Sequence, residues 1–228
     1  MDKPLPTGDE KVRAVRSMFD AIAPRYDLVN RVMTFGMDRG WRKRAVDALR
    51  LPQGSLVVDV ACGTGDFCRE LERRGSRSVG MDLSLGMLRE ARTDAPLVQA
   101  DGLRMPLADG SVDGITCGFA LRNVSDVAEL IREFARVLRP GGRISLLEVA
   151  EPESRVLRFG NKIYFRRIVP VIGGLLSDRD AYRYLPESTS YLPDRAGLVA
   201  LIRENGFPDV RSDLVRLGVA QIITGTRG

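Results

Sequence analysis

The sequence contains no histidine among its 228 residues. Histidine is the only side chain whose unperturbed pKa lies near neutrality, so an acid–base step here must use a carboxylate, a tyrosine, a lysine, a perturbed cysteine or water. Nucleophilic sites of the Ser-His or Cys-His type are therefore excluded, and most hydrolase functions are excluded with them.

Cysteine is also scarce, since only Cys62, Cys68 and Cys117 are present. An odd number without a framework spacing predicts reduced thiols and a cytoplasmic protein. Cys62 and Cys68 have no histidine to complete a ligand set, so we expect no metal.

No apolar run approaches the ~18 residues that a membrane span needs. The polar residues 1–10 contain no signal-peptide core.

Positive charge is abundant, with a net charge of +5, and it gathers in residues 155–176, which contain no acid. Basic residues interleaved with apolar ones suit an anionic surface, either lipid headgroups or nucleic acid. The long apolar runs favour lipid, so we expect a peripheral position on the inner face of the cell membrane and no nucleic-acid partner. A solvated basic face, an ordinary packing helix and a homodimer face are the alternatives.

Residues 56–67, LVVDVACGTGDF, are the most informative stretch of the chain. An apolar run, a loop with Gly63 and Gly65, and a helical pattern predict a strand–loop–helix unit whose backbone lies close to a ligand. A dinucleotide fingerprint would need a third glycine at position 68, where Cys68 stands. Asp66 places a carboxylate where a pyrophosphate would sit, which favours a sulfonium cofactor over a nicotinamide one.

Hydrophobic periodicity predicts alternating strands and helices, and hence an α/β fold with a mostly parallel seven-stranded sheet, helices on both faces and a C-terminal antiparallel hairpin. The expected strands are 55–60, 78–82, 97–100, 112–118, 143–149, 210–215 and 218–225. The expected helices are 10–23, 38–49, 66–74, 85–92, 127–138 and 194–205.

Acidic residues stand at the ends of three successive strands: Asp59, Asp82 and Asp101. In such a sheet, ligands bind beyond the carboxyl ends of the strands. We expect Asp82 to accept hydrogen bonds from both hydroxyls of a ribose, and Asp101 to lie near an adenine. The alternative is that Asp82 and Asp101 only cap the turns that follow them.

Four further motifs follow one another along the chain: residues 26–41 (YDLVNRVMTFGMDRGW), 119–124 (FALRNV), 136–148 (RVLRPGGRISLLE) and 182–188 (YRYLPES). Together they resemble the menaquinone/ubiquinone C-methyltransferase family, whose members are class I, S-adenosylmethionine-dependent enzymes with a Rossmann-like fold. The resemblance runs from about residue 16 to the C-terminus. It implies one methyltransferase domain over 1–228, with a substrate lid (10–50), a cofactor-binding core (54–150), a substrate cap (151–190) and a closing helix and hairpin (191–228).

The resemblance and the strand-end pattern together assign site residues. The expected cofactor contacts are Asp59, Gly63, Thr64, Gly65, Asp82, Asp101, Gly102 and Gly118. The candidate catalytic residues are Asp38, Tyr26, Glu148 and Arg122, with Arg122 stabilising a developing phenolate. The expected substrate contacts are Tyr26, Trp41, Arg122, Asn123, Tyr184 and Ser188. The chain departs from the family at Asp38, where many members carry histidine, at Gly118, where serine is frequent, and at 148–150, where EVA replaces Glu-Phe-Ser.

The resemblance implies methyl transfer from S-adenosylmethionine to a ring carbon of a prenylated hydroquinone, in particular conversion of demethylmenaquinol to menaquinol. A small-molecule C- or O-methyltransferase of secondary metabolism would share every cofactor residue, so only the substrate-side motifs separate the two. A nicotinamide-dependent oxidoreductase is disfavoured by Asp66 and by the missing third glycine. An RNA-binding module is disfavoured because few aromatic residues interleave with the basic ones.

Overall fold

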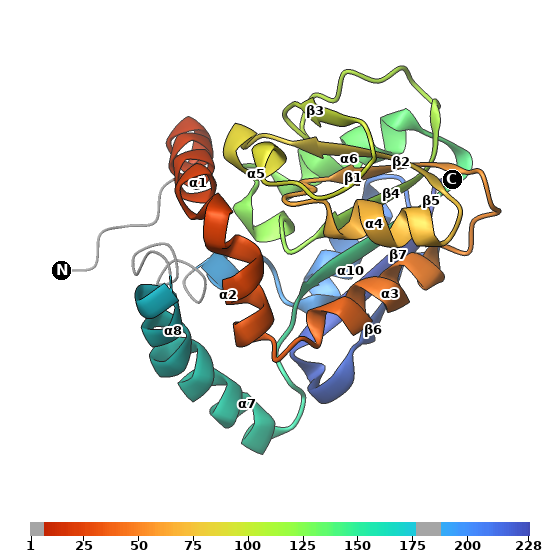
Figure 1. Ribbon diagram of the computed structural model, residues 1–228. Helices are drawn as coiled ribbons and strands as arrows, with labels where there is room; N and C mark the ends of the chain where they lie inside the picture. Colours follow the sequence, from red (N-terminus) through yellow and green to blue (C-terminus); the bar gives the residue numbers. More distant parts are fainter. Residues whose placement is uncertain (1–6, 177–187) are drawn as a thin grey trace.

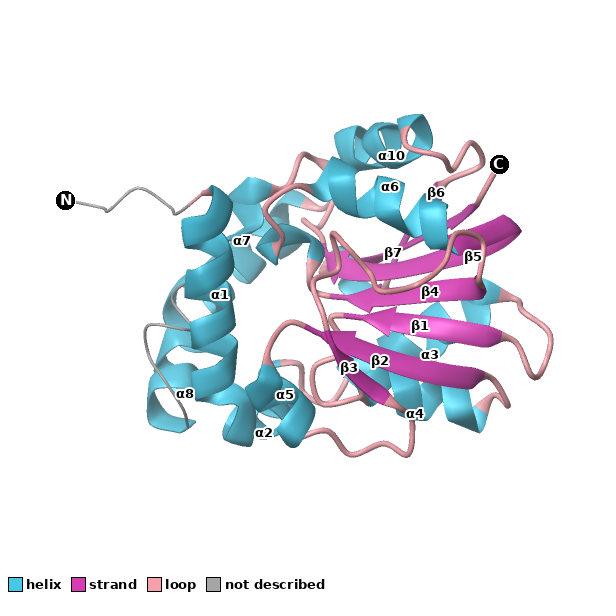
Figure 2. Ribbon diagram, turned by 90° about the horizontal axis from the view of Figure 1, so that it is seen from above, coloured by secondary structure: helices cyan, strands magenta, loops and turns pink. Residues whose placement is uncertain are grey.

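The computed structural model describes residues 7–176 and 188–228. One seven-stranded sheet has the order β3-β2-β1-β4-β5-β7-β6. Strands β1 to β5 run parallel, β7 is antiparallel to β5, and β6 is antiparallel to β7 (Figure 2). The strands are Leu56–Val60 (β1), Arg77–Asp82 (β2), Leu97–Gln99 (β3), Val112–Gly118 (β4), Leu138–Val149 (β5), Arg211–Leu214 (β6) and Ala220–Thr226 (β7). The predicted fold class is confirmed, including its C-terminal hairpin.

Helices cover both faces of this sheet (Figure 2). On one face, Phe134 of α6 and Ile202 of α10 are fully buried in the larger apolar core. On the other, Leu49 of α3 and Leu71 of α4 bury a second core. The helices over the sheet are Asp38–Leu49 (α3), Asp66–Arg73 (α4), Val127–Val137 (α6) and Arg195–Glu204 (α10). A parallel strand such as β1 is buried on both sides, which explains its nearly continuous apolar sequence.

The N-terminal helices stand beside the carboxyl edge of the sheet (Figure 1). Helix α1 spans Gly8–Ile22, close to the predicted 10–23, but a second helix, α2 (Tyr26–Met33), was not predicted. Pro24 reads as a helix end in the sequence. In the fold it occupies the first turn of a short 3₁₀ helix, Ala23–Arg25, where its missing N–H costs no hydrogen bond and the chain continues into α2.

Two other boundaries differ from prediction. Helix α5 is only Leu85–Arg89, capped by Ser84, whose hydroxyl accepts from the backbone N–H of Met87 at 3.1 Å. Strand β5 begins at Leu138 rather than 143, because Leu138 pairs with Val112 before the register shifts.

Residues 155–176 form helices that pack beside α2 rather than on the sheet (Figure 1). They are α7 (Arg155–Ile163), a π-helical turn (Tyr164–Ile168) and α8 (Val169–Leu176). Val169 is buried against Val29, and the Tyr164 hydroxyl donates to the Met33 carbonyl at 2.6 Å. Within the described residues, no helix is long and apolar enough to cross a membrane.

Candidate active site

A pocket of about 930 Å³, measured out to its open mouth, lies at the carboxyl ends of β1, β2 and β4. We call it the strand-end pocket. Helix α1 contributes Val12, Val15 and Phe19 to its wall. Of the predicted cofactor contacts, those that line it are Gly63, Asp82, Asp101, Gly102 and Gly118.

Asp82 is the best-anchored acid in this pocket. Its Oδ2 accepts from the Gly63 N–H and its Oδ1 from the Ser84 N–H, both at 2.8 Å. Burial raises the pKa of its carboxyl, against the opposing effect of these backbone N–H groups. Each oxygen keeps a second lone pair, so the carboxylate both holds the glycine loop and offers acceptors to a vicinal diol.

Backbone strain marks the same pocket. Ala61 and Phe119 follow β1 and β4 with φ of +56° and +57°, a left-handed conformation that non-glycine residues rarely adopt. Each such residue costs roughly 1–3 kcal/mol and persists where the surrounding structure requires it. Both line the strand-end pocket, so the strain lies where the chain must turn sharply beside a ligand.

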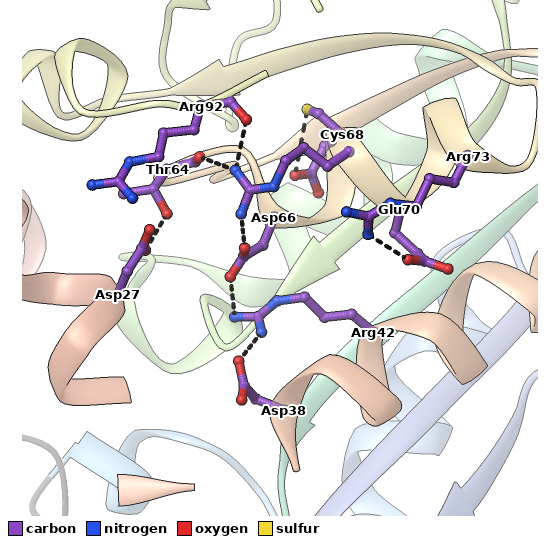
Figure 3. A network of polar contacts seen from close by, with 11 residues as sticks. Asp27, Asp38, Arg42, Thr64, Asp66, Cys68, Glu70, Arg73 and Arg92 are labelled. Carbon is purple, nitrogen blue, oxygen red and sulfur yellow. Dashed lines mark hydrogen bonds and ion pairs between the residues drawn. The ribbon is translucent and has the colours of Figure 1, made fainter. Parts of the chain in front are cut away.

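Asp101 and Thr64 were both predicted to contact the cofactor, but only Asp101 lines the strand-end pocket. Asp101 lines the pocket, but it is exposed and its Oδ1 accepts from the Leu103 N–H at 2.9 Å, so it also caps its own turn. Thr64 is buried and is not among the residues lining the pocket. Its hydroxyl donates to Asp27 of α2 at 2.5 Å, which ties the glycine loop to the N-terminal helices (Figure 3).

Asp59 lies beneath the glycine loop and does not line the pocket. Only 1% of it is exposed, its Oδ1 accepts from the Thr116 hydroxyl at 2.8 Å, and the Cys68 thiol donates to its Oδ2 at 3.9 Å. Burial raises the pKa of Asp59 to about 8. The carboxyl is therefore largely protonated at neutral pH and supports the loop from below.

We expect Asp59→Asn to stabilise the protein at alkaline pH. The unfolded chain releases this proton near the ordinary value of 3.8, whereas the folded protein retains it up to about pH 8, so wild-type stability falls as pH rises through that window. Asparagine carries no such proton. Thermal midpoints at pH 5 and pH 9 should show the variant gaining more on wild type at the higher pH, because most of the window lies between them. Asp94→Asn, at an exposed position, is the control.

Gly118 explains one departure from the family. A Cβ at this position would lie 2.6 Å from Cε2 of Phe67, whose ring is buried at the start of α4. Phe67 therefore occupies the space that a serine side chain would need.

We predict that Gly118→Ala lowers the free energy of unfolding by about 1–3 kcal/mol, the usual cost of overpacking. Urea titration measures the change. In a double-mutant cycle with Phe67→Leu, the combined loss should be smaller than the sum of the single losses. Strict additivity would contradict the steric explanation.

A second, larger pocket of about 1500 Å³, again measured out to its mouth, lies between α2, α3 and α7. We call it the apolar pocket. It shares Phe19, Tyr26 and Phe119 with the strand-end pocket, so the two spaces meet at these aromatic rings. Trp41 lines it and lies 6.4 Å from Phe119 between ring centroids. Predicted site residues that line it are Tyr26, Asp38, Trp41 and Arg122.

Asp38 is paired rather than free. Arg42 donates to its Oδ2, and the Thr34 hydroxyl donates to its Oδ1 at 2.8 Å. Arg42 also pairs with Asp66 at 3.2 Å, and Arg69 pairs with Asp66 in turn (Figure 3). Burial lowers the pKa of Arg42, but the two carboxylates outweigh this and raise it overall.

Arg42 is a pocket residue that the sequence reasoning missed, although its spacing of four from Asp38 on one helix was a usable signal. The pairing of Arg42 with Asp66 also weakens the prediction that the Asp66 carboxylate would repel a pyrophosphate. That carboxylate is balanced by Arg42 and Arg69, so it repels an anion less than its position in the sequence suggests.

Arg122 and Glu148 form an ion pair in which both side chains are almost fully buried. Glu148 lines neither pocket; its Oε1 also accepts from the Val149 N–H at 2.9 Å, so it acts on the site by holding Arg122. Within the described residues, Arg122 Nε and Asn123 Oδ1 are buried without a hydrogen-bond partner. Asn123 lines the strand-end pocket. Unpaired buried polar atoms are costly, so these two suit a ligand.

The N-terminal helices are tied to two further strand-end loops by side chains that the sequence reasoning did not single out. Asp20 accepts from the Ser84 hydroxyl at 2.6 Å and the Gly86 N–H at 2.8 Å, after β2. Lys11 donates to the Val124 carbonyl at 2.7 Å, after β4, and its burial lowers its pKa to about 8. Spacing carries no signal for such contacts, because they join distant segments.

Of the three remaining predicted contacts, Gly65 and Ser188 line neither pocket. Gly65 has φ of +82° and a Cβ there would meet Thr93, but it is not a lining residue. Ser188 is fully buried and lines neither pocket. Tyr184 lies outside the described residues. Among residues 7–176 and 188–228, no three acidic or cysteine side chains gather at metal-binding distance.

The strand-end residues fit an adenosyl group that carries a sulfonium. Asp82 suits a ribose, and the glycine loop lets backbone approach closely. Arg42 and Arg69, two cations beside the loop, are already paired with Asp66 and so are less available to a pyrophosphate.

Solved methyltransferases share this fold. The structure of a Haloferax volcanii methyltransferase with its Trm112 activator superposes with a TM-score of 0.67 at 20% identity, covering 92% of this chain and 97% of that one. A Thermotoga maritima SAM-dependent methyltransferase gives 0.66 at 20% identity, covering 94% and 100%. The chain therefore has the class I methyltransferase fold.

The family follows from sequence similarity. The profile of the ubiE/COQ5 methyltransferase family matches residues 7–227. Demethylmenaquinone methyltransferase of Roseiflexus castenholzii is 43% identical over 231 residues, covering 98% of this chain and 97% of that protein. Ubiquinone/menaquinone biosynthesis C-methyltransferase UbiE of Geobacter sulfurreducens is 40% identical, covering 96% and 90%. The chain belongs to the ubiE/COQ5 methyltransferase family, as its motifs predicted.

Proposed function

We propose that the protein transfers a methyl group from S-adenosylmethionine to a ring carbon of a prenylated hydroquinone, converting demethylmenaquinol to menaquinol. The names of the two relatives described above support this substrate. The observation that carries it is Arg122, a guanidinium with an unpartnered Nε in an apolar pocket that meets the strand-end pocket at Tyr26. A phenolic oxygen would lie against this guanidinium, and a lipid-like tail would fill the apolar remainder.

When bound, S-adenosylmethionine supplies an electrophilic methyl group on a sulfonium. The hydroquinone carbon becomes nucleophilic as its neighbouring hydroxyl loses a proton, and ionising a phenol of pKa near 10 at pH 7 costs about 4 kcal/mol. Holding the reacting atoms in line can supply ~7–11 kcal/mol. The free energy supplied by positioning the substrate against Phe19, Tyr26 and Phe119 therefore exceeds the free energy needed to ionise the phenol. Arg122 stabilises the phenolate as it develops.

The proton acceptor is best sought among residues that line the apolar pocket. Asp38 lines it and each of its carboxylate oxygens keeps a free lone pair. Burial raises the pKa of Tyr26, so its hydroxyl stays protonated and serves as a hydrogen-bond donor. Glu148 contributes by fixing Arg122. We therefore assign the proton to Asp38, directly or through a water.

We expect Asp38→Asn to lower turnover about tenfold to a hundredfold, because an amide cannot take up the phenolic proton, while affinity for S-adenosylmethionine is kept. Single-turnover rates and equilibrium dialysis measure the two quantities. Thr34→Val, which removes one hydrogen bond but leaves the carboxylate, is the matched control and should lower turnover less. Equal turnover of Asp38→Asn and wild type at saturating quinol would remove Asp38 from the mechanism.

The decisive assay supplies labelled S-adenosylmethionine with a panel of reduced demethylated quinones and determines product mass and methyl position. Carbon methylation of a naphthohydroquinone supports the proposal. Oxygen methylation, or turnover of small phenols alone, would favour the alternative, a methyltransferase of secondary metabolism.

The surroundings of the pocket support a lid and a membrane partner. Helices α1 to α3 cover the apolar pocket as a lid and α7 covers it as a cap, within one methyltransferase domain. The basic segment 155–176 supports peripheral association with an anionic membrane on the cytoplasmic side. A homodimer through the same segment is the alternative, which sedimentation at several concentrations tests.

A further inference from the structure

The exposed apolar side chains gather around one pocket. In the part of the chain that the structure describes, every exposed large apolar side chain except Leu85 belongs to α2 and the turn after it, to α7–α8, or to the turn before β7. Each of these three segments contributes residues to the apolar pocket, and four of the exposed side chains line it: Phe35, Val156, Leu157 and Leu217. Exposed apolar surface that is continuous with a pocket indicates an interaction site rather than scattered surface residues.

Two of these side chains occupy turns that should carry glycine or asparagine. Phe35, in the turn after α2, has φ of +51° and is 76% exposed. Leu217, in the turn before β7, has φ of +66° and is 54% exposed. A bulky residue in the left-handed region strains the backbone, and an exposed one gains little burial to offset the strain. The ring of Phe35 lies 6.1 Å from that of Tyr164, but burial explains neither residue.

Their position gives the explanation. Phe35 and Leu217 both line the mouth of the apolar pocket, together with Val156, which is 80% exposed on α7. Phe159, further along α7, is 68% exposed. We propose that Phe35, Leu217 and the exposed face of α7 insert into an anionic lipid bilayer, so that the apolar pocket opens directly into the membrane and a tailed substrate enters without crossing water.

Charge around the mouth matches that partner. Arg155, Arg158 and Arg167 are exposed on the same segment, which contains no acid. Glu151 and Glu153, the two acids just before the segment, lie 3.8 Å from Arg158 and 3.2 Å from Arg195, so each already faces an arginine. Exposed apolar side chains interspersed with arginines on one segment fit a surface of anionic headgroups over hydrocarbon.

The inference rests on the proposed function only in that the substrate carries a lipid tail. Its test is vesicle binding without any quinol, so failure here leaves methyl transfer untouched, and failure of quinol methylation leaves the binding result standing.

The full-length protein is cosedimented with vesicles of phosphatidylglycerol and phosphatidylcholine, and with phosphatidylcholine alone. Phe35→Asn and Leu217→Asn each remove an apolar anchor while suiting the left-handed turn, so each should weaken partitioning about tenfold. The double variant should lose about a hundredfold. Leu85→Asn, which removes an exposed apolar side chain outside this region, should bind as wild type. A wild-type affinity for S-adenosylmethionine and a thermal midpoint no lower than that of wild type would show that the variants are folded.

Phe35→Trp provides a second measurement that keeps the apolar anchor. Its added fluorescence should be quenched by brominated lipids beyond the quenching of the wild-type Trp41. Wild type that fails to bind anionic vesicles at low salt, a double variant that binds as wild type, or no added quenching would each overturn the proposal. A wild-type dimer that Phe35→Asn dissociates would also overturn it, because the face would then join two copies of the chain.

Discussion

The Asp82→Ala variant is expected to bind S-adenosylmethionine at least a hundredfold more weakly than wild type. The carboxylate offers two oxygens to a ribose diol, and a hydrogen bond to a charged group contributes about 1.5–3 kcal/mol. The same oxygens hold the N–H groups of Gly63 and Ser84, so their loss also loosens the glycine loop. Isothermal titration measures the dissociation constant.

Asp101→Ala is the matched comparison for Asp82→Ala. Asp101 lines the same pocket but is exposed, so its hydrogen bonds compete with water and its loss should cost less than tenfold. Equal losses at the two positions would contradict the placement of the ribose at Asp82. A thermal midpoint for each variant separates loss of binding from loss of folding.

Replacing Arg122 by methionine should lower turnover about a hundredfold to a thousandfold, the range seen when a donor to a developing oxyanion is removed. It should also destabilise the protein by about 3–5 kcal/mol, because Glu148 is left buried without its cation. Turnover comes from single-turnover kinetics with a demethylated quinol, and stability from urea unfolding.

A double variant separates the two effects. Arg122→Met with Glu148→Gln removes both charges, so most of the lost stability should return while turnover stays low. Arg122→Lys keeps a charge but not the guanidinium geometry and should recover turnover in part. Full recovery of turnover in the uncharged double variant would show that Arg122 has only a structural role.

Much of the fold could be predicted because its signals are local. The glycine loop follows an apolar strand within a dozen residues, and the alternation of strand and helix patterns implies a parallel sheet. The errors arose where packing overrides a local signal. Pro24 reads as the end of a helix, yet α2 begins two residues later, since proline is tolerated in a first turn.

Some residues of the candidate site could be predicted from local sequence, and others could not. Asp82, Asp101 and Gly102 line the strand-end pocket because the carboxyl ends of parallel strands meet at one edge, a rule that needs only strand positions. Asp59 also stands near the end of its strand, but it is in register with Gly80, two residues before Asp82, and its side chain points under the loop toward Thr116 and Cys68. Strand pattern alone does not distinguish these two orientations of an acid at a strand end.

The sequence by itself determined the methyltransferase class, the family and the edge of the sheet where the cofactor residues lie, because motif spacing and periodicity encode them within short segments. Only the tertiary structure decided which charges pair between different elements: Arg42 with Asp66, and Arg122 with Glu148, 26 residues away. It also placed Phe67 against Gly118 and brought Phe35 and Leu217 to one pocket mouth. Such contacts depend on how distant elements pack, and side-chain packing is set by the whole fold rather than by any one segment.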